Sequence, residues 1–217
     1  MGLVEALDDA FENSNVGATA AIVGVRQVDP DNDEDAYSFQ QLVDYLRWDN
    51  DGEMDNAHDL RNQYGADIVV LLVDKNISDW GLAFRVYAGS EETFAIVEWD
   101  LAIAEYVGAH EIGHLMGGNH EKEVKIVHYP ATYTHGHRFF IFPYAGYHGT
   151  IMTTTAENVI GYFSDPNITY QGHPIGSTTY ARFAYWLDNH ALQFSNNRDR
   201  PPPPSPPDNL RFYDDSI

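Results

Sequence analysis

The sequence predicts a mixed α/β (α+β) domain, in which helices pack on a twisted mixed sheet. The uninterrupted aliphatic run 68–73 is typical of a strand buried on both faces, and therefore of a central strand. Apolar residues recur at helical spacing over 37–48 and 178–194, as in helices that bury one face. The motif His-Glu-Ile-Gly-His at 110–114 sets functional side chains on one face of a further helix.

Composition limits the partners that this chain could bind. The 217 residues include 12 Lys and Arg against 33 Asp and Glu, a formal net charge of −21. That charge argues against nucleic acid and anionic membranes as partners. No apolar run reaches the about 18 residues that span a bilayer, and no signal segment precedes the first helix. The absence of cysteine excludes disulfides and thiolate ligands. The sequence indicates no oligomeric state.

Three helices and one strand are predicted before the aliphatic run. Residues 3–13 carry apolar side chains at helical spacing, whereas 18–28 alternate loosely, as a strand would. Further helices are expected over 37–48 and 54–64, and Gly65 ends the second of them.

Two strands and a long helix are predicted next along the chain, before the helix over 178–194. The strands cover 81–87 and 93–99, and the helix covers 100–116. Gly117 then ends this helix, because glycine readily adopts the positive φ of a sharp turn.

Two acidic segments offer oxygen ligands for Ca²⁺. Residues 29–35 read Asp-Pro-Asp-Asn-Asp-Glu-Asp, and residues 49–53 read Asp-Asn-Asp-Gly-Glu. Neither has the complete spacing of a defined calcium loop. Solvated turns are the simpler interpretation, and a Ca²⁺ site remains open.

The motif around residue 110 predicts a catalytic metal site. His110 and His114 are four residues apart, so a helix places both on one face. A turn at Gly117 can return His120 as a third imidazole. Three neutral nitrogens would hold Zn²⁺ and leave a fourth position for water, as in catalytic rather than structural zinc sites. Glu111 would then act as general base.

This pattern is similar to the extended zinc signature of the metzincin metallopeptidases. Metzincins also carry a tight turn with a methionine beneath the zinc, and Gly149-Thr150-Ile151-Met152 resembles it. The resemblance implies that Met152 supports the metal without binding it. It also implies a zincin fold, with the zinc helix at the base of the cleft and an irregular C-terminal subdomain.

Further segments resemble secreted bacterial reprolysin-like peptidases, which implies an extracellular location. They are the Asp-Gly before Met54, the passage 61–70 and the turn 162–166. The resemblance covers about residues 1–195. It also implies that an edge strand pairs with an extended substrate, and the residues that match this strand are Gly81, Leu82 and Ala83.

The chain departs from that family at three places. It begins inside the opening helix, where the family has an earlier strand. Trp80 replaces a cysteine often found before the edge strand. Thr153 and Thr154 stand where some metzincins have an additional tyrosine ligand, so no such ligand is expected.

Three regions are expected along the chain. Residues 1–197 form the catalytic domain, 198–207 a proline-rich linker, and 208–217 resemble the start of a truncated fibronectin type III module. After His120 the chain is expected to be loop-dominated up to residue 150. We interpret four histidines in that stretch as ordinary loop residues rather than ligands; these are His128, His135, His137 and His148.

The chain is predicted to be a zinc-dependent endopeptidase. It would hydrolyse peptide bonds through a metal-bound water, with Glu111 as general base. One alternative is a non-catalytic zinc-bearing binding domain of a larger secreted protein. Another is a zinc hydrolase acting on a non-peptide amide. Some relatives prefer Asp on the leaving side of the cut bond. Because no Lys or Arg occurs from Phe139 to Ala181, a mainly apolar pocket is expected instead.

Overall fold

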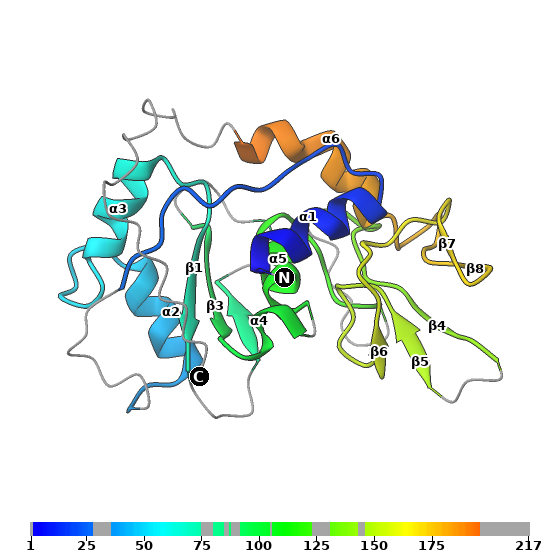
Figure 1. The fold of residues 1–217 in the computed structure, drawn as a ribbon, viewed down its shortest axis with the longest axis horizontal. Helices are drawn as coiled ribbons and strands as arrows, with labels where there is room; N and C mark the ends of the chain where they lie inside the picture. The colour runs from blue at the N-terminus through cyan, green and yellow to red at the C-terminus, as the bar shows by residue number, and fades with distance from the viewer. Residues whose placement is uncertain are drawn as a thin grey trace, which may run out of the picture.

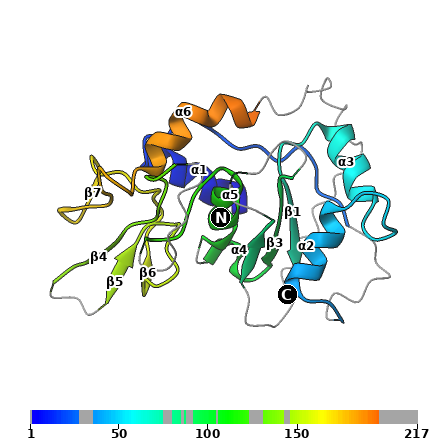
Figure 2. The same ribbon diagram turned by 180° about the vertical axis from the view of Figure 1, so that it is seen from behind.

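The computed structural model describes residues 2–27, 36–74, 80–84, 87, 92–104, 106–122, 131–142 and 146–195. Figure 1 shows one sheet with helices α2 and α3 at one end of the molecule and the short strands β4–β8 at the other. Helices α1 and α5 lie between these two parts, and α6 crosses the top. The view from behind in Figure 2 shows the same order. The predicted α/β fold with an irregular C-terminal part is thus present.

The main sheet has the strand order β1-β3-β2. Strand β1 (Val69–Val73) runs parallel to β3 (Phe94–Glu98), and β2 (Gly81–Ala83) runs antiparallel to β3 on its other side. All five residues of β3 are buried, so β3 is the central strand. The predicted strand over 93–99 is therefore present, and the one over 81–87 is reduced within the described residues to β2.

The prediction that 68–73 is the central strand is wrong. Strand β1 lies at one edge of the sheet, and four of its five residues retain some exposure, with Leu72 41% exposed. An aliphatic run specifies an extended, apolar segment, but it carries no information about which strands lie beside it. The central strand is β3, whose sequence mixes aliphatic residues with Phe94 and Glu98.

Helices cover both faces of this sheet. Strand residues alternate between faces, so Phe94 and Ile96 pack against helix α2 (Phe39–Arg47), whereas Val97 packs on the opposite side beside Val107 of α5. Helix α2 buries its predicted apolar face and begins with a Ser38–Gln41 capping box. These contacts hold α2 on one face of the sheet and α5 on the other.

Two other helices follow their predictions closely. Helix α1 (Leu3–Asn13) buries four residues of its apolar stripe. Helix α3 (Asn56–Tyr64) ends at Gly65, whose φ of 61° is the left-handed conformation expected of a glycine cap.

The predicted strand over 18–28 is not formed within its described part, residues 18–27. This segment pairs with no strand of the described chain, and its side chains Ile22 and Val25 are 65% and 71% exposed. Hydrogen bonds to two helices hold it instead: the Ala20 N–H donates to Asp8 of α1 at 2.7 Å, and the Arg26 guanidinium donates to the Tyr64 hydroxyl of α3. The alternating pattern was compatible with a strand, but a strand also requires a partner.

The single helix predicted over 100–116 is divided in two. Helix α4 (Leu101–Ala104) and helix α5 (Val107–Leu115) are separated near Tyr106, whose φ of 58° is incompatible with a continuing helix. The residue spacing across this break still looked helical, so the sequence pattern concealed it. Helix α5 therefore begins at Val107 and is not a continuation of α4.

The C-terminal part combines short strands with one helix. Strands β4 (Arg138–Phe140), β5 (Tyr147–Gly149) and β6 (Asn158–Val159) form a second sheet, and β7 (Thr169–Tyr170) pairs with β8 (His173–Pro174). Of these strands, β4 and β5 lie in the stretch up to residue 150 that was expected to be loop-dominated.

Helix α6 begins later than the 178–194 prediction and spans Phe183–Ser195. It shares one buried cluster with α1 and α5. The Trp186 indole N–H donates to the Met116 carbonyl at 2.9 Å, so α6 is attached to the C-terminal end of α5.

Some predictions concern residues outside the described part. They are the acidic segment 29–35, the linker 198–207 and the module start at 208–217. Among the described residues, every helix is too short or too polar to cross a bilayer.

Candidate metal centre

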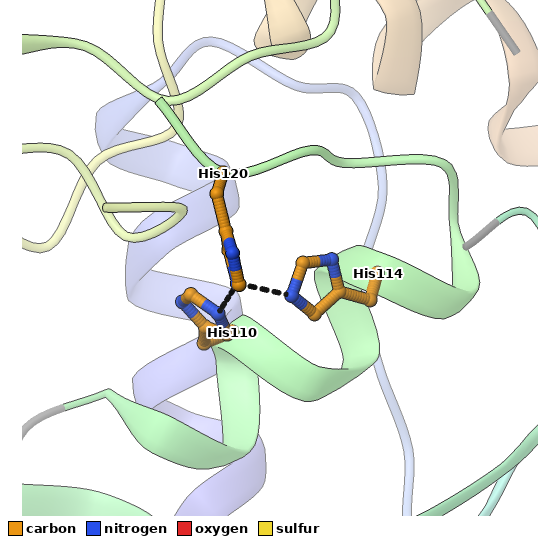
Figure 3. A group of neighbouring side chains, drawn as sticks. All are labelled: His110, His114 and His120. Atoms are coloured by element: carbon orange, nitrogen blue, oxygen red, sulfur yellow. Dashed lines mark hydrogen bonds between the residues drawn. The ribbon is translucent and has the colours of Figure 1, made fainter. Parts of the chain in front are cut away.

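Three histidines converge at one point, from α5 and the turn that follows it. The Nε2 atom of His120 lies 3.1 Å from Nε2 of His110 and 2.9 Å from Nε2 of His114. Figure 3 shows the three rings directed toward one another. Gly117 adopts a φ of 102°, which allows the chain to reverse and bring His120 back over the helix. The structure therefore places His110, His114 and His120 together as the spacing predicted.

Backbone carbonyls orient the two helical imidazoles. Nδ1 of His110 lies 2.7 Å from the Ile151 carbonyl, and Nδ1 of His114 lies 2.7 Å from the Gly118 carbonyl. A carbonyl can only accept, so each Nδ1 carries the proton and each Nε2 presents a lone pair to the centre. Such outer contacts are characteristic of imidazoles arranged for a metal.

The electrostatics of the site favour neutral imidazoles. Burial, followed by the neighbouring His120, lowers the pKa of His110 from 6.5 to about 4. Burial and the two neighbouring histidines also lower the pKa of His114. Three lone pairs at this separation repel one another unless a cation lies between them. Two nitrogens bound tetrahedrally to Zn²⁺ are about 3.3 Å apart, close to the observed spacing. The donor set thus fits zinc.

Met152 lies beneath this group as part of the tight turn. It is fully buried, and its neighbour Ile151 supplies the carbonyl that orients His110. A Cβ added to Gly113 would lie 2.5 Å from the Met152 sulfur, and one added to Gly118 would lie 2.9 Å from its methyl carbon. The methionine therefore packs directly against the backbone that carries the three histidines.

Glu111 is buried between α5 and the edge strand β2. Burial raises the pKa of its carboxyl group from 4.5 to about 8, although the Ala83 N–H donates a hydrogen bond that opposes this rise. Its side chain is only 6% exposed. The carboxyl group is therefore held at a fixed place, one residue from His110.

The three edge-strand residues of the sequence hypothesis differ in orientation. Phe84 N–H donates to the Phe94 carbonyl at 3.0 Å, and Glu98 N–H donates to the Trp80 carbonyl at 2.9 Å. In an antiparallel pair these bonds alternate, so Leu82 also directs its backbone toward β3. Gly81 and Ala83 direct theirs to the open edge. The Leu82 side chain packs with the α2 cluster.

Sequence reasoning missed Glu121, the residue directly after the third histidine. Its buried carboxylate accepts hydrogen bonds from the N–H groups of Thr154 and Thr155, at 3.0 and 2.9 Å, and from the Thr155 hydroxyl. Burial acts to raise the pKa of Glu121, but these hydrogen bonds lower it overall. The available signal was an acidic residue directly after the third histidine of the motif.

Of the four histidines interpreted as loop residues, His135 supports the fold of the site. It is fully buried, and its Nδ1 lies 2.7 Å from the His120 carbonyl, so it supports the turn that carries the third imidazole. His148 lies in β5 and His137 directly precedes β4, and the rings of both lie beside Phe139. His128 lies outside the described residues.

Among the described residues, the three histidines are the group of His and acidic side chains close enough to hold a metal ion. The acidic segment 49–53 is hydrogen-bonded within itself and to Asp55, which follows it. Asp55 accepts from the N–H groups of Asp51 and Gly52. The Asp51 carboxylate likewise accepts from the Glu53 N–H. These carboxylates close turns onto the backbone.

Comparison with known proteins gives consistent results. The model of the reprolysin-like metallo-peptidases of family M12B matches residues 2–121. The peptidyl-Asp metalloendopeptidase of Stenotrophomonas maltophilia strain K279a is 34% identical over 177 residues, which cover 80% of this chain and 41% of that protein. The enzyme of the same name from Xanthomonas campestris pv. campestris is 33% identical over 177 residues, covering 80% and 40%. The chain thus spans about two fifths of the length of these relatives.

A solved structure shares the fold. A chain in a structure described as a chaperone–substrate complex superposes with a TM-score of 0.68 over 91% of this chain and 30% of that chain, at 18% sequence identity. At that identity the likeness concerns the fold alone.

Proposed function

The chain belongs to the reprolysin-like metallopeptidases of family M12B, and we propose that it is a zinc-dependent endopeptidase. The observation that carries this proposal is the convergence of three imidazole Nε2 atoms beside a buried carboxyl group. His110, His114 and His120 are the proposed ligands, and Met152 is the proposed support beneath them.

Glu111 is the proposed general base. When bound, zinc would polarise the scissile carbonyl and make a water molecule more acidic. Glu111 accepts the proton of the attacking water and then delivers it to the departing amine, so the same carboxyl group serves both steps. Its burial excludes bulk water from this exchange.

The substrate is proposed to be an extended peptide that pairs with β2. The outward N–H and C=O groups of Gly81 and the outward C=O group of Ala83 offer hydrogen bonds to an added strand, whereas the Ala83 N–H is donated to Glu111. This edge lies beside Glu111, so a paired peptide would place its backbone next to the base.

Selectivity has two candidate forms. The absence of Lys and Arg from Phe139 to Ala181 supports an apolar pocket. The name of the relatives, peptidyl-Asp metalloendopeptidase, supports recognition of an aspartyl residue. Arg138, just before that stretch, is the candidate cation for the second form, because its Nη1 lies 2.8 Å from the Thr155 hydroxyl after Met152. Cleavage of matched peptides with Asp or Leu after the scissile bond separates the two.

The activity of the whole protein, its extracellular location and its protein substrates are parts of this proposal. A non-catalytic binding domain is the alternative, and Glu111 argues against it because metal binding alone does not need this carboxyl group. A hydrolase of non-peptide amides is disfavoured by the peptide-like edge of β2.

The deciding experiment compares the wild type with Glu111→Ala on casein and on a quenched peptide, with zinc measured in both proteins. The wild type should cleave and stop when a chelator is added. The variant should retain one zinc while turnover falls by about 10²- to 10⁴-fold. If both hold zinc and neither cleaves, the binding-domain alternative is favoured. If neither holds zinc, the proposed centre is wrong.

A further inference from the structure

We infer that Gly81 is a positioning residue for Glu111: because it lacks a side chain, Glu111 can lie against the open edge of β2. This inference rests on the proposed function and extends it from the zinc helix to the neighbouring strand.

The space at Gly81 is filled by Glu111. A Cβ added at Gly81 would lie 2.8 Å from Cγ, 2.8 Å from Oε1 and 3.0 Å from Cδ of Glu111. Real Cβ atoms essentially never approach other atoms this closely, so a side chain at position 81 must displace the glutamate. The three atoms nearest to this Cβ all belong to Glu111.

The pleat of β2 explains why this contact concerns Gly81. Successive side chains of a strand point to opposite faces. Leu82 packs on the α2 side of the sheet, whereas Ala83 packs on the other side with Leu115 of α5. Gly81 therefore shares the α5-facing side with Ala83, and a side chain here would point toward α5.

The same two residues fix the glutamate in two ways. Gly81 leaves room for its methylene groups, and Ala83 donates its N–H to the carboxyl group. A displaced Glu111 loses that hydrogen bond, and its carboxyl group moves relative to the proposed metal. Because proton transfer requires the base within hydrogen-bond reach of the attacking water, the effect falls on kcat.

The test is Gly81→Ala, assayed on a quenched peptide with zinc content measured. We expect kcat to fall by about 10- to 100-fold, as a displacement near 1 Å can produce. KM should change less than twofold and zinc should remain at one per chain. Gly24→Ala is the matched control, because its Cβ would meet the Tyr64 ring at 3.1–3.3 Å away from the site. It should leave kcat unchanged.

A second measurement does not depend on catalysis. The shift in unfolding midpoint caused by Gly81→Ala is compared in the wild type and in Glu111→Ala. If Glu111 fills the space, the substitution lowers the midpoint in the wild type but not in Glu111→Ala, where the Cβ meets no carboxylate. An equal loss in both backgrounds, or an unchanged kcat in Gly81→Ala, overturns the inference. An inactive wild type with the expected coupling would overturn the proposed function alone.

Discussion

Glu111 and His110 make opposite contributions to stability as pH changes. In the metal-free protein the raised pKa of Glu111, about 8, keeps its carboxyl group protonated where the unfolded chain has already ionised. The folded state therefore binds more protons, and the free energy of unfolding falls as pH rises from about 4.5 to 8. The lowered pKa of His110, about 4, acts in the other direction, so that stability is lost as pH falls from 6.5 toward 4.

Glu111→Gln isolates the two contributions. With metal removed by a chelator, the difference in free energy of unfolding between Glu111→Gln and the wild type should shift in favour of the variant from pH 5 to pH 8. The shift should reach about a few kcal/mol, because an amide does not ionise. The variant should keep the loss of stability below pH 6.5. Urea unfolding at pH 5, 6.5 and 8 measures both effects, and a difference that is independent of pH would contradict the assignment.

At the scale of elements, Glu121 connects the turn after α5 to the segment after Met152. Its carboxylate accepts two N–H groups and a hydroxyl from Thr154 and Thr155. An amide has a single acceptor oxygen, so Glu121→Gln leaves part of this set unsatisfied. We expect a loss of about 1–3 kcal/mol in the free energy of unfolding.

Urea unfolding of Glu121→Gln should be compared with Glu12→Gln on the exposed face of α1, which removes one charge without a buried contact. The control should change stability by less than about 0.5 kcal/mol. Equal effects in the two variants would show that the Glu121 bonds contribute nothing beyond charge.

The elements show what local patterns can and cannot predict. Helices α1, α2 and α3 and the meeting of the three histidines followed from spacing, because these depend on neighbours along the chain. The edge position of β1, the unpaired segment 18–27 and the break at Tyr106 depend on packing between distant segments. The Glu121 contacts likewise join residues more than 30 positions apart, so no local pattern could indicate them.

At the scale of the whole molecule, the proposed metal links the folded state to ligand concentration. A metal that binds only the folded protein stabilises it by about 4 kcal/mol when free metal exceeds its Kd by 1,000-fold. Chelation should therefore lower the unfolding midpoint, and adding Zn²⁺ should restore it.

Calorimetry with and without chelator checks this prediction. His114→Ala should remove the response to chelator. His58→Ala should keep it, because His58 contacts the Leu46 carbonyl and lies outside the three-histidine group. A response that persists in His114→Ala would place the stabilising metal elsewhere.

The attachment of α6 to the end of α5 has a spectroscopic consequence. Of the four tryptophans, Trp48, Trp80 and Trp99 are more than half exposed, whereas Trp186 is 8% exposed. Trp186 also stacks on His190 and donates to the Met116 carbonyl. The short-wavelength part of the intrinsic fluorescence therefore comes from one indole, that of Trp186 in α6, which lies against the C-terminal end of α5. A red shift of that emission reports the release of α6 from α5, without any introduced label.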